Sequence, residues 1–348
     1  MIYNNKNNIM CGMSGGVDSS VAALLLKNEG YNVLGATLVL HEEILETEEV
    51  TKAKKICNNL GINHTVIDLR TNFKKFVIDN FIKKYEEALT PNPCIECNKY
   101  IKFGKMLEEA IKNNCELLAT GHYAQIEKVG EKFFLKKAKD LKKDQTYFLY
   151  MLGQEILSII KLPLGSLTKE EVREIAQENG FFNAKNKDSQ DICFIKNNDY
   201  VSFLNENSCI NKVGNFYDLQ GNNLGMHNGI INYTIGQRKG LNIALGKPAY
   251  VISKNSVNNA VVLGDDINLF IDTVKIKNVA FSAFDKLQGE IKVSAKLRYR
   301  AKEAKCILRQ LDNDNYLLKF DEPQRAVTPG QYAVIYDGDI CLGGGEII

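Results

Sequence analysis

Three short stretches of this chain carry residue types that are suited to chemistry. The first is a loop rich in glycine and hydroxyl groups, Met13-Ser14-Gly15-Gly16-Val17-Asp18-Ser19-Ser20, which follows an apolar run and leads into a helical pattern. Backbone N–H groups at such a helix start are unpaired and favour an anion. The glycines let the backbone approach a phosphate, and the serine hydroxyls add donors. The loop therefore predicts a phosphate-binding site.

This loop differs from the two commonest phosphate-binding loops. A Walker A loop needs a lysine before its Ser/Thr, whereas Asp18 stands before Ser19 here. The dinucleotide fingerprint needs three spaced glycines, which are absent. The pattern Ser-Gly-Gly-Val-Asp-Ser resembles the PP-loop of the ATP pyrophosphatases, which split ATP between its α- and β-phosphates. The alternatives are an ordinary turn before a helix and, for Asp18, either an acid–base group or a helix-start residue.

The second stretch, residues 90–98, contains Cys94 and Cys97. Pro91 and Pro93 predict a rigid, non-helical loop. Cys97 is then expected at or just before a helix N-terminus, where the helix dipole lowers the pKa of a thiol and favours the nucleophilic thiolate. Cys-x-x-Cys is also half of a structural zinc site, but no second Cys-x-x-Cys or His-x-x-x-His completes one.

The third stretch, residues 188–195, contains Cys193 between Ile192 and Phe194. Taken alone, this setting favours a packed core cysteine. Asp191 is interpreted either as an acid–base group or as a turn cap. The nine cysteines are scattered and odd in number, which argues against a disulfide framework and for a reducing cytosol. Six are interpreted as small buried hydrophobes: Cys11, Cys57, Cys115, Cys209, Cys306 and Cys341.

Alternating strand and helix patterns must position the three stretches. Apolar strand runs at residues 9–11, 33–40, 64–69 and 116–120 are separated by helical patterns at 47–60, 72–89 and 97–114. This alternation predicts an α/β fold, a doubly wound parallel sheet with helices on both faces. Ligands of such sheets lie beyond the carboxyl ends of the strands, so the loops after Cys11, Leu40 and Thr120 are expected to face one crevice.

The pattern changes past about residue 207 to short alternating strands with turn residues. We predict three domains: an N-terminal catalytic domain over 1–205, a small β-rich central domain over 206–270 and a C-terminal β-barrel over 271–348. The net charge of +2 confines any nucleic-acid surface to a local patch. No apolar run is long enough to span a membrane, and the polar N-terminus predicts no signal peptide. We therefore expect a cytoplasmic protein without a membrane partner.

Further motifs accompany the three stretches. The chain contains Ala119-Thr120-Gly121-His122-Tyr123, Lys143-Asp144-Gln145-Thr146-Tyr147-Phe148-Leu149, Gly236-Gln237-Arg238-Lys239-Gly240-Leu241, Arg298-Tyr299-Arg300 and Thr328-Pro329-Gly330-Gln331. In this order and spacing, they resemble the bacterial tRNA-specific 2-thiouridylase family over nearly the whole chain. That family places sulfur on C2 of the wobble uridine, U34, of certain tRNAs.

The resemblance implies a HUP-like PP-loop ATP pyrophosphatase domain, a central domain that contacts tRNA, and ATP with Mg²⁺. It implies that Cys193 receives sulfur as a persulfide from a cysteine desulfurase or sulfur-relay protein, and that Cys97 is the nucleophile left in a disulfide with Cys193. AMP and pyrophosphate are the expected by-products. The implied ATP-binding residues are Gly12, Met13, Ser14, Gly15, Gly16, Val17, Asp18, Ser19, Leu38 and Gly121. Asn92, Pro93 and Cys94 match the loop around the target base, and the implied tRNA contacts are His122, Lys143, Asp144, Gln145, Arg298, Tyr299 and Gln331.

Other interpretations remain open at this point. Cys94 stands where some relatives have Asp, so Cys94, Cys97 and Cys193 could together ligate a [4Fe-4S] cluster of a cluster-dependent thiolase. The chain could also be another ATP pyrophosphatase, such as an amide-forming ligase or a different tRNA modifier, or a non-catalytic tRNA-binding protein. The lysine-rich run 128–143 is either a phosphate contact or a solvated hairpin. The segment after Leu40, which includes Glu42 and Glu43, is short for the family.

Overall fold

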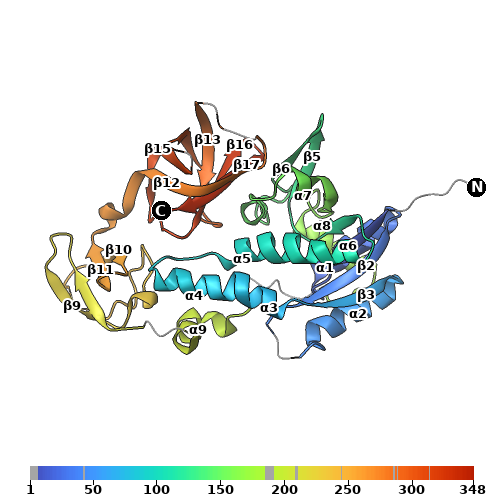
Figure 1. Ribbon diagram of the computed structural model, residues 1–348, viewed down its shortest axis with the longest axis horizontal. Coiled ribbons are helices and arrows are strands. Elements are labelled where there is room, and N and C mark those ends of the chain that lie inside the picture. Colours follow the sequence, from blue (N-terminus) through green and yellow to red (C-terminus); the bar gives the residue numbers. More distant parts are fainter. Residues whose placement is uncertain are drawn as a thin grey trace, which may run out of the picture.

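The computed structural model describes residues 7–41, 44–184, 192–207, 211–243, 245–284, 287, 289–312 and 314–348. Of the residues discussed above, Glu42, Glu43, Cys209 and residues 188–191 of the third stretch, including Asp191, lie outside this description. Figure 1 shows the N-terminal sheet at one end of an elongated molecule and the central domain at the other. The C-terminal barrel lies over the long helices that run between them.

The N-terminal sheet is parallel, with the strand order β3-β2-β1-β4-β7. Its strands are β1 (Asn8–Gly12), β2 (Asn32–Val39), β3 (Asn63–Asp68), β4 (Leu117–Ala119) and β7 (Ile160–Lys161). Along β1, Met10 packs into one core cluster while Ile9 and Cys11 pack into another, so both faces of the sheet are covered. The predicted doubly wound sheet is confirmed, and its strand order reverses between β1 and β4, where ligands of such sheets bind.

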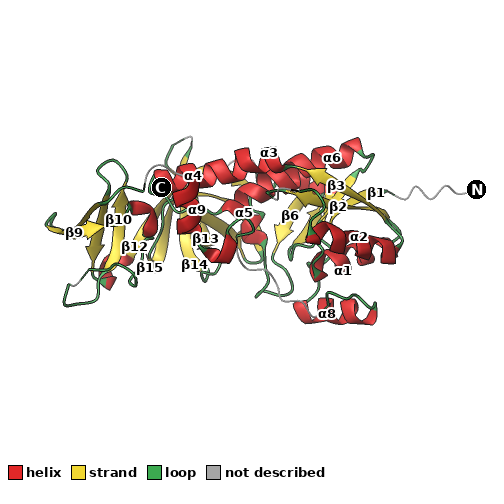
Figure 2. Ribbon diagram, turned by 90° about the horizontal axis from the view of Figure 1, so that it is seen from below, coloured by secondary structure: helices red, strands yellow, loops and turns green. Residues whose placement is uncertain are grey.

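Helices cover both faces of this sheet, as Figure 2 shows. Helices α1 (Val17–Asn28) and α2 (Glu48–Leu60) lie on one side, and α3 (Arg70–Phe73) and α6 (Met106–Lys112) lie on the other. Thr47 caps α2 by accepting a hydrogen bond from the Val50 N–H, and Gly61 ends α2 in the left-handed conformation. The helix predicted at 47–60 is confirmed.

Two long helical segments extend from the sheet toward the barrel. The first joins α3, the π-helical turn η1 (Lys74–Ile78) and α4 (Asp79–Glu86); the second joins α5 (Pro93–Glu96), the π-helical segment η2 (Cys97–Lys105) and α6. The prediction that the second segment begins at Cys97 was wrong. It begins at Pro93, because the Asn92 side chain caps the Cys94 N–H at 3.2 Å and a proline at the first helical position needs no N–H partner.

The remaining elements join the sheet to the two β-rich domains. They are the hairpin β5 (Gln125–Val129) and β6 (Lys132–Lys136), the helices α7 (Gln154–Ile159), α8 (Lys169–Glu178) and α9 (Tyr200–Asn207), and four short 3₁₀ helices, η3 (Thr146–Phe148), η4 (Lys196–Asn198), η5 (Ile230–Asn232) and η6 (Asp266–Leu269). Thr168 and Glu171 form the predicted capping box at the start of α8. Within the described ranges, no helix is long and apolar enough to cross a membrane.

The two C-terminal domains consist mainly of strands. The central sheet has the order β10-β11-β8-β9, from β8 (Gly214–Tyr217), β9 (Asn223–His227), β10 (Tyr250–Asn255) and β11 (Ala260–Gly264). The barrel runs β12-β15-β14-β13-β16-β17 and closes through β12 and β17. Its strands are β12 (Phe270–Phe281), β13 (Glu290–Lys296), β14 (Ala304–Gln310), β15 (Asn315–Arg325), β16 (Tyr332–Asp337) and β17 (Ile340–Ile347). Strand β6 pairs with β17, so the hairpin of the first domain extends the barrel sheet.

Candidate active site

The phosphate loop, residues 12–20, connects β1 to α1. Gly16 caps α1 in an extended conformation without a side-chain hydrogen bond, which leaves first-turn N–H groups of α1 without a capping side chain. Gly15 has φ +73°, and a Cβ on it would lie 2.9 Å from Lys52 Cβ. The Ser19 hydroxyl donates to the Gly16 carbonyl at 3.0 Å and lies 3.3 Å from Ser14 Oγ. Backbone donors and hydroxyls therefore gather at one helix N-terminus, as an anion site requires.

Three residues from outside the loop hold it in place. The Asn183 amide donates to the Gly15 carbonyl at 2.8 Å. Lys169 Nζ lies 2.7 Å from Asp18 Oδ1, and the Tyr123 hydroxyl donates to the same oxygen at 2.7 Å. Asp18 is thus held by a cation and a hydroxyl, which favours the helix-start interpretation over the acid–base one. Lys169 is 151 positions away from Asp18, so no local pattern could have identified it.

The loop after β4 packs directly against the phosphate loop. A Cβ on Gly121 would lie 3.0 Å from the backbone of both Asp18 and Ser19, so a glycine is needed for this close approach. The other residues expected to bind ATP line the same edge of the sheet: Gly12 ends β1 and Met13 follows it, buried Val17 begins α1, and half-buried Leu38 lies near the carboxyl end of β2. The fold thus brings together the whole expected ATP-binding set.

His122 connects the phosphate loop to the long helices. It is buried next to Gly121, and its Nδ1 lies 2.7 Å from Thr120 Oγ1. Its Nε2 lies 3.4 Å from Lys102 Nζ on η2. Because a lysine only donates, Nε2 accepts and Nδ1 carries the proton. Burial, followed by the charge of Lys102, holds the pKa of His122 well below its usual value, so the ring is neutral at pH 7.

The three cysteines of interest form one electrostatic group around Lys102. Burial raises the pKa of all three thiols, and the charge of Lys102 partly opposes this rise; the charges of Cys97 and Cys94 raise the pKa of Cys193 further. Cys97 is buried, whereas Cys94 and Cys193 are exposed. Cys193 is therefore not the packed core cysteine that its apolar neighbours suggested, although Phe194 beside it is buried.

Lys102 is a functional candidate that the sequence did not suggest. With ordinary α-helical spacing, positions 97 and 102 point to different sides of a helix. Residues Cys97–Lys105 form a π-helix, in which residues five apart are hydrogen-bonded neighbours. Single-sequence patterns do not reveal such a π-helical segment, and so this pairing could not be foreseen.

The thiols do not have the lowered pKa that a helix N-terminus would produce. Burial raises the pKa of Cys97 to about 11 and that of Cys193 to about 12. Part of Cys193 is exposed, but protein atoms surround most of its thiol. The resulting desolvation raises its pKa by more than the charge of Lys102 lowers it. For Cys97 the physical reason is its position: it lies in the second turn of the helix that begins at Pro93. The predicted lowering for Cys97 was wrong for this state.

Most residues expected to contact tRNA are hydrogen-bonded within the protein. Arg298 Nη2 donates to the Ala326 carbonyl at 2.9 Å, and the Gln331 amide donates to the Thr90 carbonyl at 2.7 Å. Buried Asp144 accepts from the Thr146 hydroxyl at 2.7 Å, and Gln145 accepts from the Tyr123 N–H at 2.9 Å. These side chains therefore organise the region, whatever else they bind.

Tyr299 and Lys143 complete the expected tRNA set. The Tyr299 ring packs on Phe148, with ring centroids 4.3 Å apart, and burial, followed by the charge of Asp144, raises the pKa of Tyr299. Lys143 is half-buried, near the end of the lysine-rich run. That run forms the β5–β6 hairpin and the segment after it, where Lys136, Lys137 and Lys139 pair with Glu127, Glu303 and Glu171. These pairs engage the three lysines concerned within the protein.

The placed residues do not fit an iron–sulfur cluster. Cys94 and Cys97 both contribute to the raised pKa of Cys193, after its burial. In the part of the chain that the structure describes, however, no group of three or more His, Cys, Asp or Glu side chains is arranged to hold a metal ion. The eight cysteines described there are all free thiols.

Comparison with known proteins covers the whole chain. Family models match at residues 7–197 (tRNA methyl transferase HUP domain), 202–265 (tRNA methyl transferase PRC-barrel domain) and 271–347 (Aminomethyltransferase beta-barrel domain). The tRNA-specific 2-thiouridylase MnmA of Clostridioides difficile is 47% identical over 359 residues, which cover 100% of this chain and 99% of that protein. The protein of the same name from Acetivibrio thermocellus is 46% identical, with 99% of each chain covered.

One similar solved structure is distant in sequence. The U34-tRNA thiolase NcsA of Methanococcus maripaludis is 21% identical, with a TM-score of 0.37 over 58% of this chain and 64% of that one, which is too low to support an argument. The full-length relatives identify the family. With almost half of its residues identical to theirs along its entire length, this chain belongs to the tRNA-specific 2-thiouridylase family.

Proposed function

We propose that this protein catalyses the ATP-dependent 2-thiolation of the wobble uridine U34 of tRNA. The observation that supports this most is the continuous path from the phosphate loop to the cysteines. Gly121 packs against the phosphate loop, and His122 beside it contacts Lys102. The charge of Lys102 in turn opposes the rise in pKa that burial causes at all three thiols. An activated nucleotide and a sulfur carrier can therefore meet in one place.

The first step is activation of a poor electrophile. The C2 oxygen of the uracil attacks the α-phosphate of ATP, forming an O–P bond and expelling pyrophosphate. The first-turn N–H groups of α1, with Ser14 and Ser19, stabilise the phosphates. Mg²⁺ bound to the triphosphate would supply counter-charge for the phosphates, which the first-turn N–H groups of α1 hold. The anticodon loop suits this step because an unpaired base leaves its stack at small cost.

The second step transfers sulfur. The terminal sulfur of a Cys193 persulfide forms a bond to C2, and the C2–O bond breaks with release of AMP. The Cys97 thiolate then attacks the inner sulfur, Cys193 Sγ, which frees the thiocarbonyl and leaves a Cys97–Cys193 disulfide. A dithiol reductant must restore the two thiols. Exposed Cys193 suits a carrier that a persulfide donor must reach, and buried Cys97 suits a resolving thiol.

The partners follow from these steps. The substrate is a tRNA with U34, contacted by the loop Asn92-Pro93-Cys94 at the base and by residues such as Tyr299 and Lys143 elsewhere. The sulfur donor is a cysteine desulfurase or a sulfur-relay protein that carries a persulfide. The need to reduce the disulfide after each turnover favours a reducing compartment such as the cytoplasm.

The test is sulfur incorporation into unmodified tRNA with ATP, Mg²⁺ and a persulfide donor. We expect 2-thiouridine at position 34 with the native chain, and none with Cys97→Ser or Cys193→Ser, while both variants still release pyrophosphate. Cys115→Ser, which changes a buried cysteine outside the site, is the matched control and should behave like the native chain. Pyrophosphate release without 2-thiouridine in the native chain would instead indicate another ATP pyrophosphatase reaction.

The cluster-dependent alternative rests on the third thiol, Cys94. Because no described group is arranged to hold a metal, we expect protein purified without oxygen to contain no stoichiometric iron or sulfide and to be fully active with persulfide. Iron-dependent activity that disappears in Cys94→Ser would favour the alternative.

A further inference from the structure

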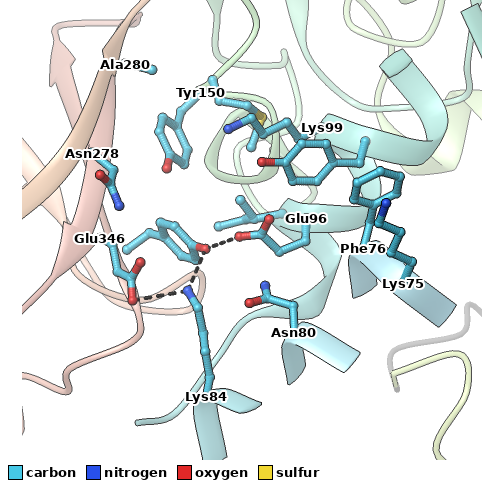
Figure 3. A pocket seen from close by; sticks show the side chains of 14 residues that line it. Lys75, Phe76, Asn80, Lys84, Glu96, Lys99, Tyr150, Asn278, Ala280 and Glu346 are labelled. Atoms are coloured by element: carbon cyan, nitrogen blue, oxygen red, sulfur yellow. Dashed lines mark hydrogen bonds and ion pairs between the residues drawn. The ribbon is translucent and has the colours of Figure 1, made fainter. Parts of the chain in front are cut away.

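A cavity of about 560 Å³ separates the long helices from the barrel. Figure 3 shows that Lys84 of α4, Glu96 of α5 and Glu346 of β17 point into it from three elements. Cys94 and Cys97 do not line it, although they flank Glu96 in the sequence. The cavity therefore lies along a side of the α5–η2 helix other than the one that carries the two cysteines.

A chain of polar contacts crosses this cavity from the barrel to the helix. The Tyr332 hydroxyl, from β16, donates to the Glu96 carboxylate. Lys84 Nζ donates to the Tyr332 oxygen at 3.3 Å and pairs with Glu346 Oε1 at 3.1 Å (Figure 3, dashed lines). Burial, followed by the charge of Glu96, raises the pKa of Tyr332 far above its usual value, so its hydroxyl stays protonated and remains a donor. We call these four residues the barrel clamp.

The barrel clamp is unlike the ion pairs on the surface of the protein. The side chains of Lys84 and Glu346 are only 11% and 10% exposed, whereas those of the neighbouring pair Lys83–Glu87, at the end of α4, are 72% and 52% exposed. Charges taken out of water gain little net stability, so a buried pair is a weak device for holding a fold together. It is a good device for fixing one geometry, because its hydrogen bonds are directional.

A second set of contacts fixes the other end of the same segment. The Thr90 N–H donates to the Pro329 carbonyl at 3.0 Å, and the Gln331 amide donates to the Thr90 carbonyl at 2.7 Å. Residues 90–97, which we call the cysteine segment, are thus hydrogen-bonded to barrel residues 329–332 near both ends. Both Cys94 and Cys97 belong to this segment.

We propose that the barrel clamp positions the cysteine segment for sulfur transfer, with Tyr332, Lys84 and Glu346 acting through Glu96 as positioning residues. This inference rests on the proposed function. Glu96 precedes Cys97 in the sequence and shares its helix, so a shift of Glu96 moves both thiols relative to the phosphate loop. Loss of the clamp should therefore uncouple the two steps: uridine is still adenylated, but the activated intermediate is hydrolysed before sulfur reaches it.

The experiment measures pyrophosphate and 2-thiouridine in the same reaction and compares their ratio among variants. Tyr332→Phe removes one hydroxyl with little change of shape, and Glu96→Ala removes the acceptor. Each should raise the ratio of pyrophosphate to 2-thiouridine about tenfold, because small displacements of reacting groups cost large factors in rate. Glu96→Gln retains an acceptor oxygen for Tyr332 and should keep the ratio within about twofold of the native value.

Lys83→Ala is the matched control, since it removes an exposed lysine next to Lys84 and should leave the ratio unchanged. An unchanged ratio in both Tyr332→Phe and Glu96→Ala would overturn the inference. An equal fall of both products would also overturn it, because that is the result of a merely structural role. If the native chain makes no 2-thiouridine at all, the proposed function fails, which is a different result from a native chain that thiolates and a clamp that has no effect.

Discussion

The phosphate loop and the cysteine segment are assembled in opposite ways. Most contacts within the phosphate loop join residues that are close in sequence: Ser14 to Ser19, Ser19 to Gly16, and Ser20 to Gly16. The cysteine segment instead takes its position from barrel residues about 240 positions away, through Gln331 and Tyr332. The shape of the phosphate loop comes from a local turn, whereas the position of the cysteine segment comes from the docking of two domains.

This difference suggests a division of labour between the two chemical steps. Adenylation needs a preformed anion site, and here a glycine-rich turn at a helix N-terminus supplies the donors while Asn183 and Lys169 hold the turn in place. Sulfur transfer needs two thiols placed against an activated base, and this placement depends on how the barrel meets the helices. Changes near the phosphate loop should therefore affect both products, whereas changes at the barrel contact should affect 2-thiouridine alone.

The largest effect is expected from Gly121→Ala. A Cβ at this position would lie 3.0 Å from the backbone of Asp18 and Ser19, which cannot move aside as a flexible side chain could. Displacing the phosphate loop should lower pyrophosphate release and 2-thiouridine formation together, by about 100-fold. Gly153→Ala, where an added Cβ meets nothing within 4 Å, is the control and should remain near native. A selective loss of 2-thiouridine in Gly121→Ala would contradict the proposed division.

The sequence predicted the local site well because its determinants are local. Glycines, hydroxyls and an apolar strand before a helix specify the phosphate loop, and the strand–helix alternation specifies a parallel sheet with the loop at its carboxyl edge. The C-terminal barrel also followed from its short alternating strands. The start of α5 was missed although a rule for it exists: Asn92 before Pro93 is a capping residue followed by a proline at the first helical position.

The second prediction concerns the burial of Cys97 in the cysteine segment. Because burial raises the pKa of Cys97 to about 11, its neutral thiol predominates at every pH well below that value. Alkylation by iodoacetamide requires the thiolate, so its rate at Cys97 should rise about 30-fold between pH 7.0 and 8.5 and continue to rise beyond pH 9.5. Mass spectrometry of the peptide measures this rate. The chain unfolded in urea is the control and should level off near pH 9; levelling off there in the folded protein would contradict the burial.

The long-range part of the site could not be predicted from one sequence. Lys169 reaches Asp18, and Tyr332 reaches Glu96, only after the chain has folded. Likewise, the sequence of residues 97–105 does not indicate the π-helical turns that place Lys102 on the same side of the helix as Cys97. The resemblance to the family supplied the identities of Cys97 and Cys193, but not what holds them.

The smallest effect is expected where the barrel touches the cysteine segment, in Gly330→Ala. Gly330 has φ +87°, and its added Cβ would lie 2.8 Å from both Leu89 Cβ and the Thr90 nitrogen. Gly338, at φ +57° in the same barrel, meets nothing within 4 Å, so Gly338→Ala carries a similar backbone strain of about 1–2 kcal/mol without that contact. Both variants should unfold at slightly lower urea concentrations, but only Gly330→Ala should lose 2-thiouridine relative to pyrophosphate, by about tenfold. If the two variants show the same ratio, the strain of the barrel, and not its contact with Thr90, sets the efficiency of sulfur transfer.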